Sequence, residues 1–268
     1  MILSKLFKKK DTVIVKKLRE DLYLLDDAHN ATGYLLIGEE KACLIDTMMG
    51  SQNLAELVGR YTDKPVVVIN THGHSDHIYG NVFFKKAYMN LKDLELAESS
   101  TKNPQFAAAC EKLGVTMSEF EDIHEGDVID LGGKTLKIYD LPGHTLGGIV
   151  ILCPEERVLF TGDSINHYLW MQLDGCLPIT EYADNLERLL FLEKEADHIL
   201  HGHAQGFDNI TLMRALLAGC RSLAAGETEK DSDYPWFCGV ATQHPFTIPE
   251  DNPANPGTHV IVYNKEDK

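Results

Sequence analysis

The stretch THGHSDHIYG, residues 71–80, decides how the rest of this sequence is interpreted. It places three histidines and one aspartate within six positions: His72, His74, Asp76 and His77. The preceding run PVVVIN, residues 65–70, is short and apolar and predicts a buried strand, so the polar cluster begins where that strand ends. Neutral imidazole and carboxylate groups are ligands for zinc, iron and manganese. A bound metal therefore explains why four titratable groups gather in one loop.

The rest of the chain offers further ligands at similar places, and these indicate two adjacent metals. A single tetrahedral site that keeps an open position does not need four ligands from one loop. Three candidates lie in a turn between strands or directly after an apolar strand: His144 in LPGHTLGG, Asp163 in LFTGDSI and His203 in ILHGHAQG. His72, His74 and His144 can fill one metal site, and Asp76, His77 and His203 the other. Asp163 has two carboxylate oxygens and can bridge both metals.

This series of motifs, H-x-H-x-D-H followed by P-G-H-T, T-G-D and G-H, resembles the metallo-β-lactamase-fold hydrolase superfamily. The resemblance extends from Asp46 in LIDTMMG to His203 and is strongest to the glyoxalase-II and lactonase branch. It implies an α+β fold, the four-layer αββα sandwich, with a dinuclear site at one edge of the sheets. It also implies that Asp46 supports the metal loop without binding metal. In HGH, either His201 or His203 can be the ligand, and the resemblance favours His203.

The ligand set predicts a metal-dependent hydrolase. Two divalent ions, in the first place Zn²⁺, with iron or manganese as other choices, would hold a shared water that becomes a hydroxide nucleophile near neutral pH. Asp76 could orient that hydroxide and is the predicted catalytic residue. The expected substrate is a small acyl compound: a thioester, lactone or ester. True β-lactamases usually lack the bridging aspartate that Asp163 supplies, and the tail after His203 departs from that of enzymes acting on glutathione thioesters.

Three other functions are compatible with the same motifs. The first is a phosphodiesterase acting on a small phosphodiester, since nucleases of the superfamily use the same ligands. The second is an iron-dependent persulfide dioxygenase. The third is a metal-stabilised binding module without catalysis, which open coordination positions argue against. Flavin-linked di-iron oxygen reductases normally carry glutamate where this chain has His74, and no flavodoxin-like domain follows.

A substrate pocket is predicted beside the metals. His167, Tyr168 and Trp170 lie in SINHYLWMQLDG, an apolar and aromatic segment shortly after Asp163. Such a loop can line a pocket, and packing in the core is an equally good interpretation. Tyr79 occupies a position where many relatives carry glycine. It would narrow the mouth of the pocket or pack in the core.

Composition limits the remaining choices. The 268 residues are 44% hydrophobic and 25% charged, which is typical of a globular protein and predicts one domain over residues 1–268. The net charge of −16 argues against nucleic acid as a partner and leaves a small-molecule substrate. The basic run KLFKKK is not followed by an apolar segment, and no run approaches 18 apolar residues, so no membrane partner is expected. The six cysteines form no C-x-x-C pair and predict buried thiols in a reducing cytoplasm.

Periodicity predicts strands joined by turns in both halves of the chain, with helices between them. Helical spacing is found at Asn53–Tyr61, Tyr182–Glu193 and Asn209–Gly226, and the pattern of 91–122 is helical and rich in loops. Strand patterns are found at Thr12–Lys17, Leu22–Asp26, Gly33–Ile37, Ala42–Asp46, 65–70, 127–131, 134–141, 148–153, 157–163, 197–200, Trp236–Val240 and His259–Tyr263. These patterns favour two β-sheets with helices outside over a simple parallel doubly wound sheet.

Overall fold

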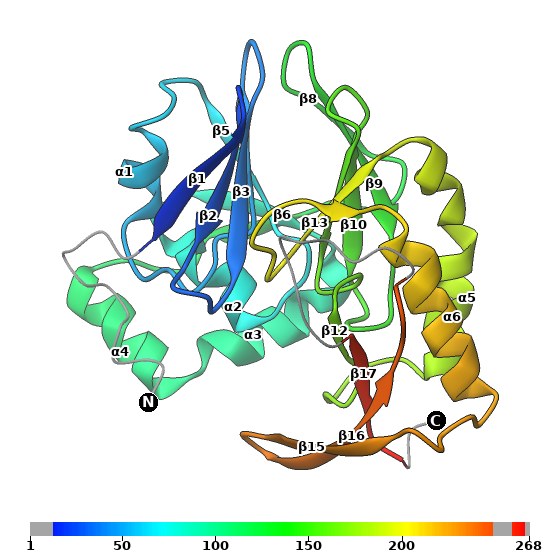
Figure 1. Ribbon diagram of the computed structural model, residues 1–268. Coiled ribbons are helices and arrows are strands. Elements are labelled where there is room, and N and C mark those ends of the chain that lie inside the picture. The colour runs from blue at the N-terminus through cyan, green and yellow to red at the C-terminus, as the bar shows by residue number, and fades with distance from the viewer. Residues whose placement is uncertain (1–12, 249–258, 266–268) are drawn as a thin grey trace. The chain divides into compact units, whose positions relative to one another are not determined.

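A computed structural model describes residues 13–248 and 259–265 (Figure 1). The chain divides into two compact units, Met1–Ile138 and Tyr139–Lys268, and each is described by itself. The run KLFKKK and the segment 249–258 of the Pro-rich stretch lie outside the described residues.

The first unit is built on a seven-stranded sheet with the strands in chain order. Its strands are β1 (Ile14–Arg19), β2 (Leu22–Asp26), β3 (Thr32–Ile37), β4 (Ala42–Ile45), β5 (Val66–Ile69), β6 (Lys86–Met89) and β7 (Glu119–Asp122). Neighbouring strands from β1 to β4 are antiparallel, and those from β4 to β7 are parallel. β3 and β4 are buried along their whole length, as expected for strands covered on both faces.

The parallel part of this sheet positions the histidine loop. Ile45 of β4 pairs with Ile69 of β5, so both strands end at the same edge of the sheet. Asp46 is the first residue after β4, and Thr71 is the second residue after β5. The backbone N–H of Asp46 donates to the carbonyl of Ile69 at 2.9 Å. Residues that lie 25 positions apart in the sequence are thereby brought side by side.

Helices of the first unit lie in the connections between its strands. They are α1 (Leu54–Val58), α2 (Ser75–Ile78), α3 (Leu94–Thr101) and α4 (Pro104–Leu113), with 3-10 turns at Tyr79–Phe83 and Leu91–Asp93. α4 begins at Asn103, whose side chain accepts hydrogen bonds from Gln105 and Phe106, and ends at Gly114 in the left-handed conformation, φ 66°. The hairpin strand β8 (Val128–Asp130) pairs with β9 (Thr135–Asp140), and β9 carries the chain into the second unit.

Four strands of the second unit, in the order β14–β13–β11–β10, belong to a six-stranded sheet that also includes β9 and β8. They are β10 (Ile149–Cys153), β11 (Val158–Gly162), β13 (His198–His201) and β14 (Asp208–Asn209). β11 and β13 are parallel neighbours, while β10–β11 and β13–β14 are antiparallel. The helices α5 (Ile179–Arg188) and α6 (Leu212–Ala224) pack against each other and share one apolar core with β10, β11 and β13.

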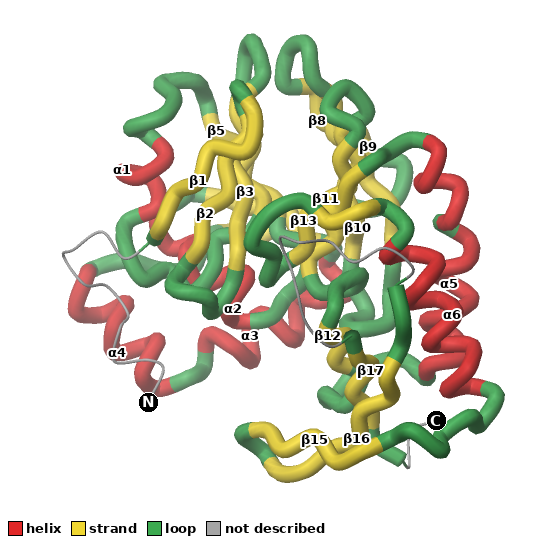
Figure 2. Tube along the Cα trace, in the orientation of Figure 1, coloured by secondary structure: helices red, strands yellow, loops and turns green. Residues whose placement is uncertain are grey.

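A second, four-stranded sheet follows in the order β12–β17–β16–β15 (Figure 2). Its strands are β12 (Tyr168–Trp170), β15 (Ser232–Trp236), β16 (Gly239–Pro245) and β17 (Val260–Tyr263). The strand expected at Trp236–Val240 is wrong, because this stretch is the tip of the β15–β16 hairpin. Trp236 pairs with Gly239, and Gly239 has a φ of 144°, which only glycine adopts readily. The helical interpretation of 91–122 is wrong at its end, because Glu119–Asp122 forms strand β7. The helix α2 and the strands β6, β12, β14 and β15 were not predicted, and the other predicted elements agree with the structure to within a few residues at their ends.

Within residues 13–248 and 259–265, no helix combines the length and the apolar character that crossing a bilayer requires.

Candidate metal centre

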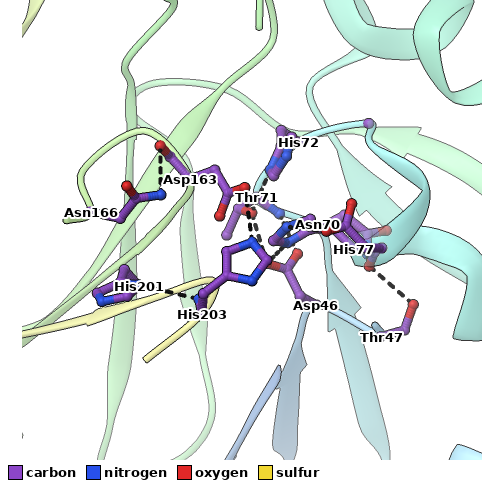
Figure 3. Close-up of polar contacts among 12 residues, drawn as sticks. Asp46, Thr47, Asn70, Thr71, His72, His77, Asp163, Asn166, His201 and His203 are labelled. Carbon is purple, nitrogen blue, oxygen red and sulfur yellow. Dashed lines mark hydrogen bonds and ion pairs between the residues drawn. The ribbon is translucent and has the colours of Figure 1, made fainter. Parts of the chain in front are cut away.

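In the histidine loop of the first unit, the side chain of Asp46 contacts the ring of His77 (Figure 3). The carboxylate Oδ2 of Asp46 lies 2.8 Å from Nδ1 of His77, and both side chains are buried. A carboxylate can only accept, so Nδ1 of His77 carries the proton and Nε2 keeps its lone pair for a metal. Asp46 itself has a φ of 57°, a left-handed conformation that costs a non-glycine residue about 1–3 kcal/mol and is held by this network. These contacts agree with the supporting role expected of Asp46.

His72 is oriented by the residue before it. The backbone N–H of Thr71 donates to Oδ1 of Asp46 at 2.8 Å, and the Thr71 hydroxyl donates to Oδ2 at 2.8 Å. Because that hydroxyl has used its hydrogen, it accepts from Nδ1 of His72 at 3.0 Å. His72 therefore also presents an unprotonated Nε2. The His74 ring lies edge-on to it, with centroids 4.9 Å apart.

Gly73 allows the loop to pass close to a neighbouring carboxylate. Its N–H donates to the buried Asp93 at 2.9 Å, and a Cβ added to Gly73 would lie 2.9 Å from the Asp93 carbonyl oxygen. A larger residue between His72 and His74 would push this backbone away. The close approach of Asp93 therefore explains why a glycine stands between His72 and His74.

The helix α2 begins directly after His74 and carries Asp76 and His77. The backbone N–H and hydroxyl of Thr47 and the side-chain amide of Asn70 all donate to the carbonyl of His77, at 2.8, 3.2 and 2.9 Å. Asp76 remains partly exposed, and its Oδ2 lies 3.8 Å from Nε2 of His77. The first unit thus gathers all four predicted ligands of THGHSDH.

In the second unit, His144 is held by a strand of the four-stranded sheet. Nδ1 of His144 donates to the carbonyl of Trp170 at 2.7 Å, which again leaves Nε2 as the ligand atom. Gly143 precedes it in a turn that packs on Tyr182, since a Cβ at Gly143 would lie 2.1 Å from a Tyr182 ring carbon. The buried Tyr182 hydroxyl donates to the carbonyl of Ser164.

Asp163 and His203 are brought together by the parallel strands β11 and β13. Gly162 pairs with His201, and the N–H of Gly202 donates to the Gly162 carbonyl at 2.8 Å. Asp163 Oδ2 consequently lies 3.2 Å from Nε2 of His203 and 3.9 Å from Nε2 of His144. The second unit thus gathers the three remaining predicted ligands, and Figure 3 shows Asp163 and His203 facing each other.

His201 has different neighbours from His203. Its ring is buried, with Nε2 3.2 Å from Oδ2 of Asp208, whereas His203 is partly exposed beside Asp163. Of the two histidines of HGH, the structure therefore places His203 beside Asp163 and His201 beside Asp208. His167 is buried as well: Nε2 lies 2.7 Å from Asp208 Oδ1 and Nδ1 lies 2.6 Å from Nδ1 of His259.

The predicted pocket residues divide into two groups. Tyr79 is buried, stacks on Phe106 with centroids 3.9 Å apart and donates its hydroxyl to the Ser100 carbonyl at 2.8 Å. Burial raises the pKa of its hydroxyl. Tyr79 and His167 are committed to packing and to a buried network, so we do not retain them in the pocket. Tyr168 is 48% exposed and remains a candidate.

Trp170 also remains a candidate for the substrate pocket. Its side chain belongs to an aromatic cluster of the four-stranded sheet. Its ring centroid lies 6.2, 5.9 and 6.1 Å from those of Tyr234, Trp236 and Phe237. Phe237 is 79% exposed. Trp170 therefore has two kinds of contact. Its backbone carbonyl accepts from His144, and its side chain lies in an aromatic cluster that includes the exposed Phe237.

Several supporting residues were missed by sequence reasoning. Thr71 and Asp93 orient His72 and Gly73, and Asp208 joins His167 to His201. Thr71 stands next to the first histidine and could have been suspected from that position. Asp93 and Asp208 carry no sequence signal, because only the fold brings them to the loops they contact.

The donor set fits divalent metals. His72, His77 and His144 each have Nδ1 engaged by an oxygen acceptor, which is the arrangement that fixes the tautomer and direction of a metal-binding imidazole. Imidazole nitrogens combined with aspartate oxygens suit zinc, iron or manganese, whereas calcium and magnesium prefer oxygen alone. The presence of metal-binding His and Asp clusters is therefore supported by the structure, without fixing the number or identity of the ions.

The sequence model of the metallo-β-lactamase superfamily matches residues 26–212, more than half of the chain. The chain therefore belongs to the metallo-β-lactamase superfamily, as the motifs indicated. Among individual relatives, acyl-coenzyme A thioesterase MBLAC2 of Homo sapiens is 25% identical over 219 residues, which cover 70% of this chain and 78% of that protein. Hydroxyacylglutathione hydrolase of Hyphomonas neptunium is 32% identical over 135 residues, covering 50% of this chain and 47% of that protein.

Solved structures agree on the fold. A metallo-β-lactamase from Pontibacter korlensis aligns with a TM-score of 0.55 and 17% identity, covering 78% of this chain and 99% of its own. One from Erythrobacter litoralis aligns with a TM-score of 0.60 and 17% identity, covering 80% and 99%. The predicted α+β fold of the metallo-β-lactamase type is confirmed. Since the named relatives are hydrolases, the prediction of a hydrolase in this superfamily is confirmed at that level.

Proposed function

We propose that this chain is a dinuclear-metal hydrolase that cleaves a small acyl substrate, with a thioester as the first choice over a lactone or ester. The observation that carries the proposal is the shared anchoring of three predicted ligands, His72, His77 and His144. Each has Nδ1 bound to an oxygen acceptor and Nε2 left as the ligand atom.

The proposed ligand sets follow from the predicted pairing. His72, His74 and His144 would hold one ion and Asp76, His77 and His203 the other, and Asp163 could contribute an oxygen to each. When bound, two divalent ions supply a Lewis acid for the substrate oxygen and lower the pKa of a shared water. We favour Zn²⁺ because imidazole and carboxylate ligands with an open position suit it, and iron or manganese are the alternatives.

The chain's own groups contribute orientation and proton handling. Asp46 and Thr71 hold the His72 and His77 rings in one tautomer, and the Trp170 carbonyl does the same for His144. Asp76 is the partly exposed carboxylate of the set and is the proposed group that orients the attacking water. Tyr168 and Trp170 are proposed to contact the substrate beside His144.

The names of the relatives favour an acyl substrate, since they include an acyl-coenzyme A thioesterase and hydroxyacylglutathione hydrolases. The chain spans about half the length of the hydroxyacylglutathione hydrolase. The net charge of −16 supports a small-molecule substrate over nucleic acid. The family match at residues 26–212 includes parts of both units, which supports the proposal that residues 1–268 form one functional domain. Among the described residues none of the six cysteines forms a disulfide, which supports the cytoplasm as the proposed compartment. Four of them are buried as predicted, but Cys176 is partly exposed and Cys238 is exposed.

Metal analysis followed by a substrate panel tests this proposal. The full-length protein is loaded with Zn²⁺ and assayed with an acyl thioester, a lactone, an aryl ester and bis-p-nitrophenyl phosphate. We expect thioester hydrolysis that Asp76→Asn lowers by about 10²–10⁴-fold, while Asp63→Asn, an exposed carboxylate outside the predicted pocket segment, leaves it unchanged. Turnover of the phosphodiester alone, or oxygen uptake on a persulfide by an iron-loaded protein, would replace the proposal with one of the two alternatives.

A further inference from the structure

A buried carboxylate links the two loops that carry Asp163 and His203. Asp208, on β14, is 1% exposed, and its two oxygens lie 2.7 Å from Nε2 of His167 and 3.2 Å from Nε2 of His201. His167 lies four residues after Asp163, and His201 lies two residues before His203. Asp208 therefore contacts one residue of each ligand loop, and neither of these two residues is a proposed ligand.

The hydrogen bonds of Asp208 determine where each histidine keeps its proton. Because a carboxylate only accepts, His167 carries a hydrogen on Nε2. Nδ1 of His201 accepts the backbone N–H of His203 at 3.2 Å, so the hydrogen of the neutral His201 ring lies on Nε2, 3.2 Å from Oδ2 of Asp208. Nδ1 of His167 is also an acceptor and receives Nδ1–H of His259 at 2.6 Å.

Burial by itself would raise the pKa of Asp208, but the contacts with His167 and His201 outweigh it and hold the pKa far below its usual value. Asp208 is therefore a buried anion that can only accept from the two rings.

We propose that Asp208 is a positioning residue that sets the separation of Asp163 and His203 through His167 and His201. The proposal rests on the proposed role of Asp163 and His203 as metal ligands. Two lone pairs on Asp208 fix both rings, and the His201 ring in turn fixes the turn His201–Gly202–His203 through the backbone N–H of His203. In the opposite tautomer, Nδ1–H of His201 would face that N–H, and two donors would repel.

An additional metal at His167, His201 and Asp208 is the competing interpretation, since their ligand atoms lie within 4.8 Å of one another. The 2.7 Å separation between His167 and Asp208 is a hydrogen-bond distance, and one set of proton positions satisfies the contacts of Asp208 with both rings. The positioning role is therefore the better supported, and the metal becomes an outcome of the test.

Two substitutions of His201 separate its two hydrogen bonds. In His201→Asn, the amide oxygen stands the same number of bonds from Cα as Nδ1, so the acceptor for His203 is kept and the donor to Asp208 is lost. In His201→Gln, the amide nitrogen corresponds to Nε2, so the donor to Asp208 is kept and the acceptor is lost. His203→Ala is the reference for loss of one metal ligand.

Zinc binding to the metal-free full-length proteins, measured by chelator competition, and thermal unfolding of the same samples are the two readouts. We expect His201→Gln to weaken one of two zinc sites by about 10–100-fold, as removal of a ligand's support does, and His201→Asn to weaken it less. Thermal stability should rank in the opposite order, because Gln keeps a partner for the buried Asp208 and Asn does not. A merely structural role would rank both readouts alike.

Equal zinc affinities for the two variants, or the same order in both readouts, would overturn the positioning role. So would a third zinc equivalent that disappears in both variants, which would identify the competing metal site. If His203→Ala retains full zinc affinity, the proposed ligand assignment fails together with the inference. If His203→Ala loses a site while both His201 variants keep it, only the inference fails.

Discussion

Asp46 and His77, 31 residues apart in the sequence, are joined by a 2.8 Å contact between a carboxylate oxygen and Nδ1 in the buried edge of the first sheet. Parallel pairing of β4 with β5 creates this contact, because the two strands end at the same level. The contact leaves Nε2 of His77 without a proton and suited to bind a metal. The register between β4 and β5 therefore determines the orientation of His77, a proposed metal ligand.

Asp46→Asn should weaken zinc binding by about 10–100-fold. The carboxylate accepts from the Thr71 N–H, the Thr71 hydroxyl and His77 Nδ1, and an amide retains only one acceptor oxygen for these three donors. Chelator competition on folded protein measures the effect. Asp63→Asn makes the same charge change away from the histidine loop and should bind zinc like the unaltered chain. Equal affinity of the two variants would show that Asp46 does not support the metal loop.

Trp170→Ala should raise the KM for an apolar acyl thioester about tenfold while zinc content stays the same. The side chain supplies aromatic contact worth about 1–2 kcal/mol, whereas His144 is held by the Trp170 backbone carbonyl, which alanine retains. Val128→Ala removes an exposed apolar side chain of the first unit and serves as the control. Loss of zinc with an unchanged KM would contradict the division of roles between the side chain and the carbonyl.

Tyr79→Phe should lower the free energy of unfolding by about 0.5–1.5 kcal/mol, because it removes the hydrogen bond to the Ser100 carbonyl. Tyr79→Ala should cost about 3–5 kcal/mol, because the stacking on Phe106 is lost as well. Denaturant unfolding gives both values. A raised KM in Tyr79→Phe at unchanged stability would return Tyr79 to the substrate pocket.

Removal of bound metal should lower the thermal stability of the protein. Ions that bind only the folded chain add about 2.7 kcal/mol when their concentration is roughly 100 times the dissociation constant. Calorimetry before and after treatment with a chelator, then after return of Zn²⁺, checks this. The midpoint should fall on chelation and recover with Zn²⁺, and a midpoint that does not change would contradict metal binding to the folded state.

The predicted ligands could be selected from the sequence because each of them stands directly after an apolar strand or in a turn next to one. Parallel strands then place such residues at one edge, as Gly162 and His201 of β11 and β13 illustrate. The same rule explains why Asp46 could be assigned a supporting role.

The supporting residues and the pocket could not be predicted with the same success. Tyr79 lies in the histidine stretch, but its burial depends on Phe106, which is 27 residues away and has no pattern in common with it. Asp208 follows no motif, and its partners come from two other loops. The apolar run at Trp236–Val240 suggested a strand, because the sequence did not reveal that Gly239 turns the chain.

The metal content of Asp163→Ala, compared with the unaltered chain and with Asp174→Ala, is the most direct test of a dinuclear centre. Element analysis of protein purified and reloaded with Zn²⁺ should give two ions per chain in the unaltered protein and in Asp174→Ala. Asp163→Ala should lose metal from both sites, because a bridging carboxylate serves both. Two ions at full occupancy in Asp163→Ala, or a single iron in the unaltered chain, would contradict the dinuclear assignment.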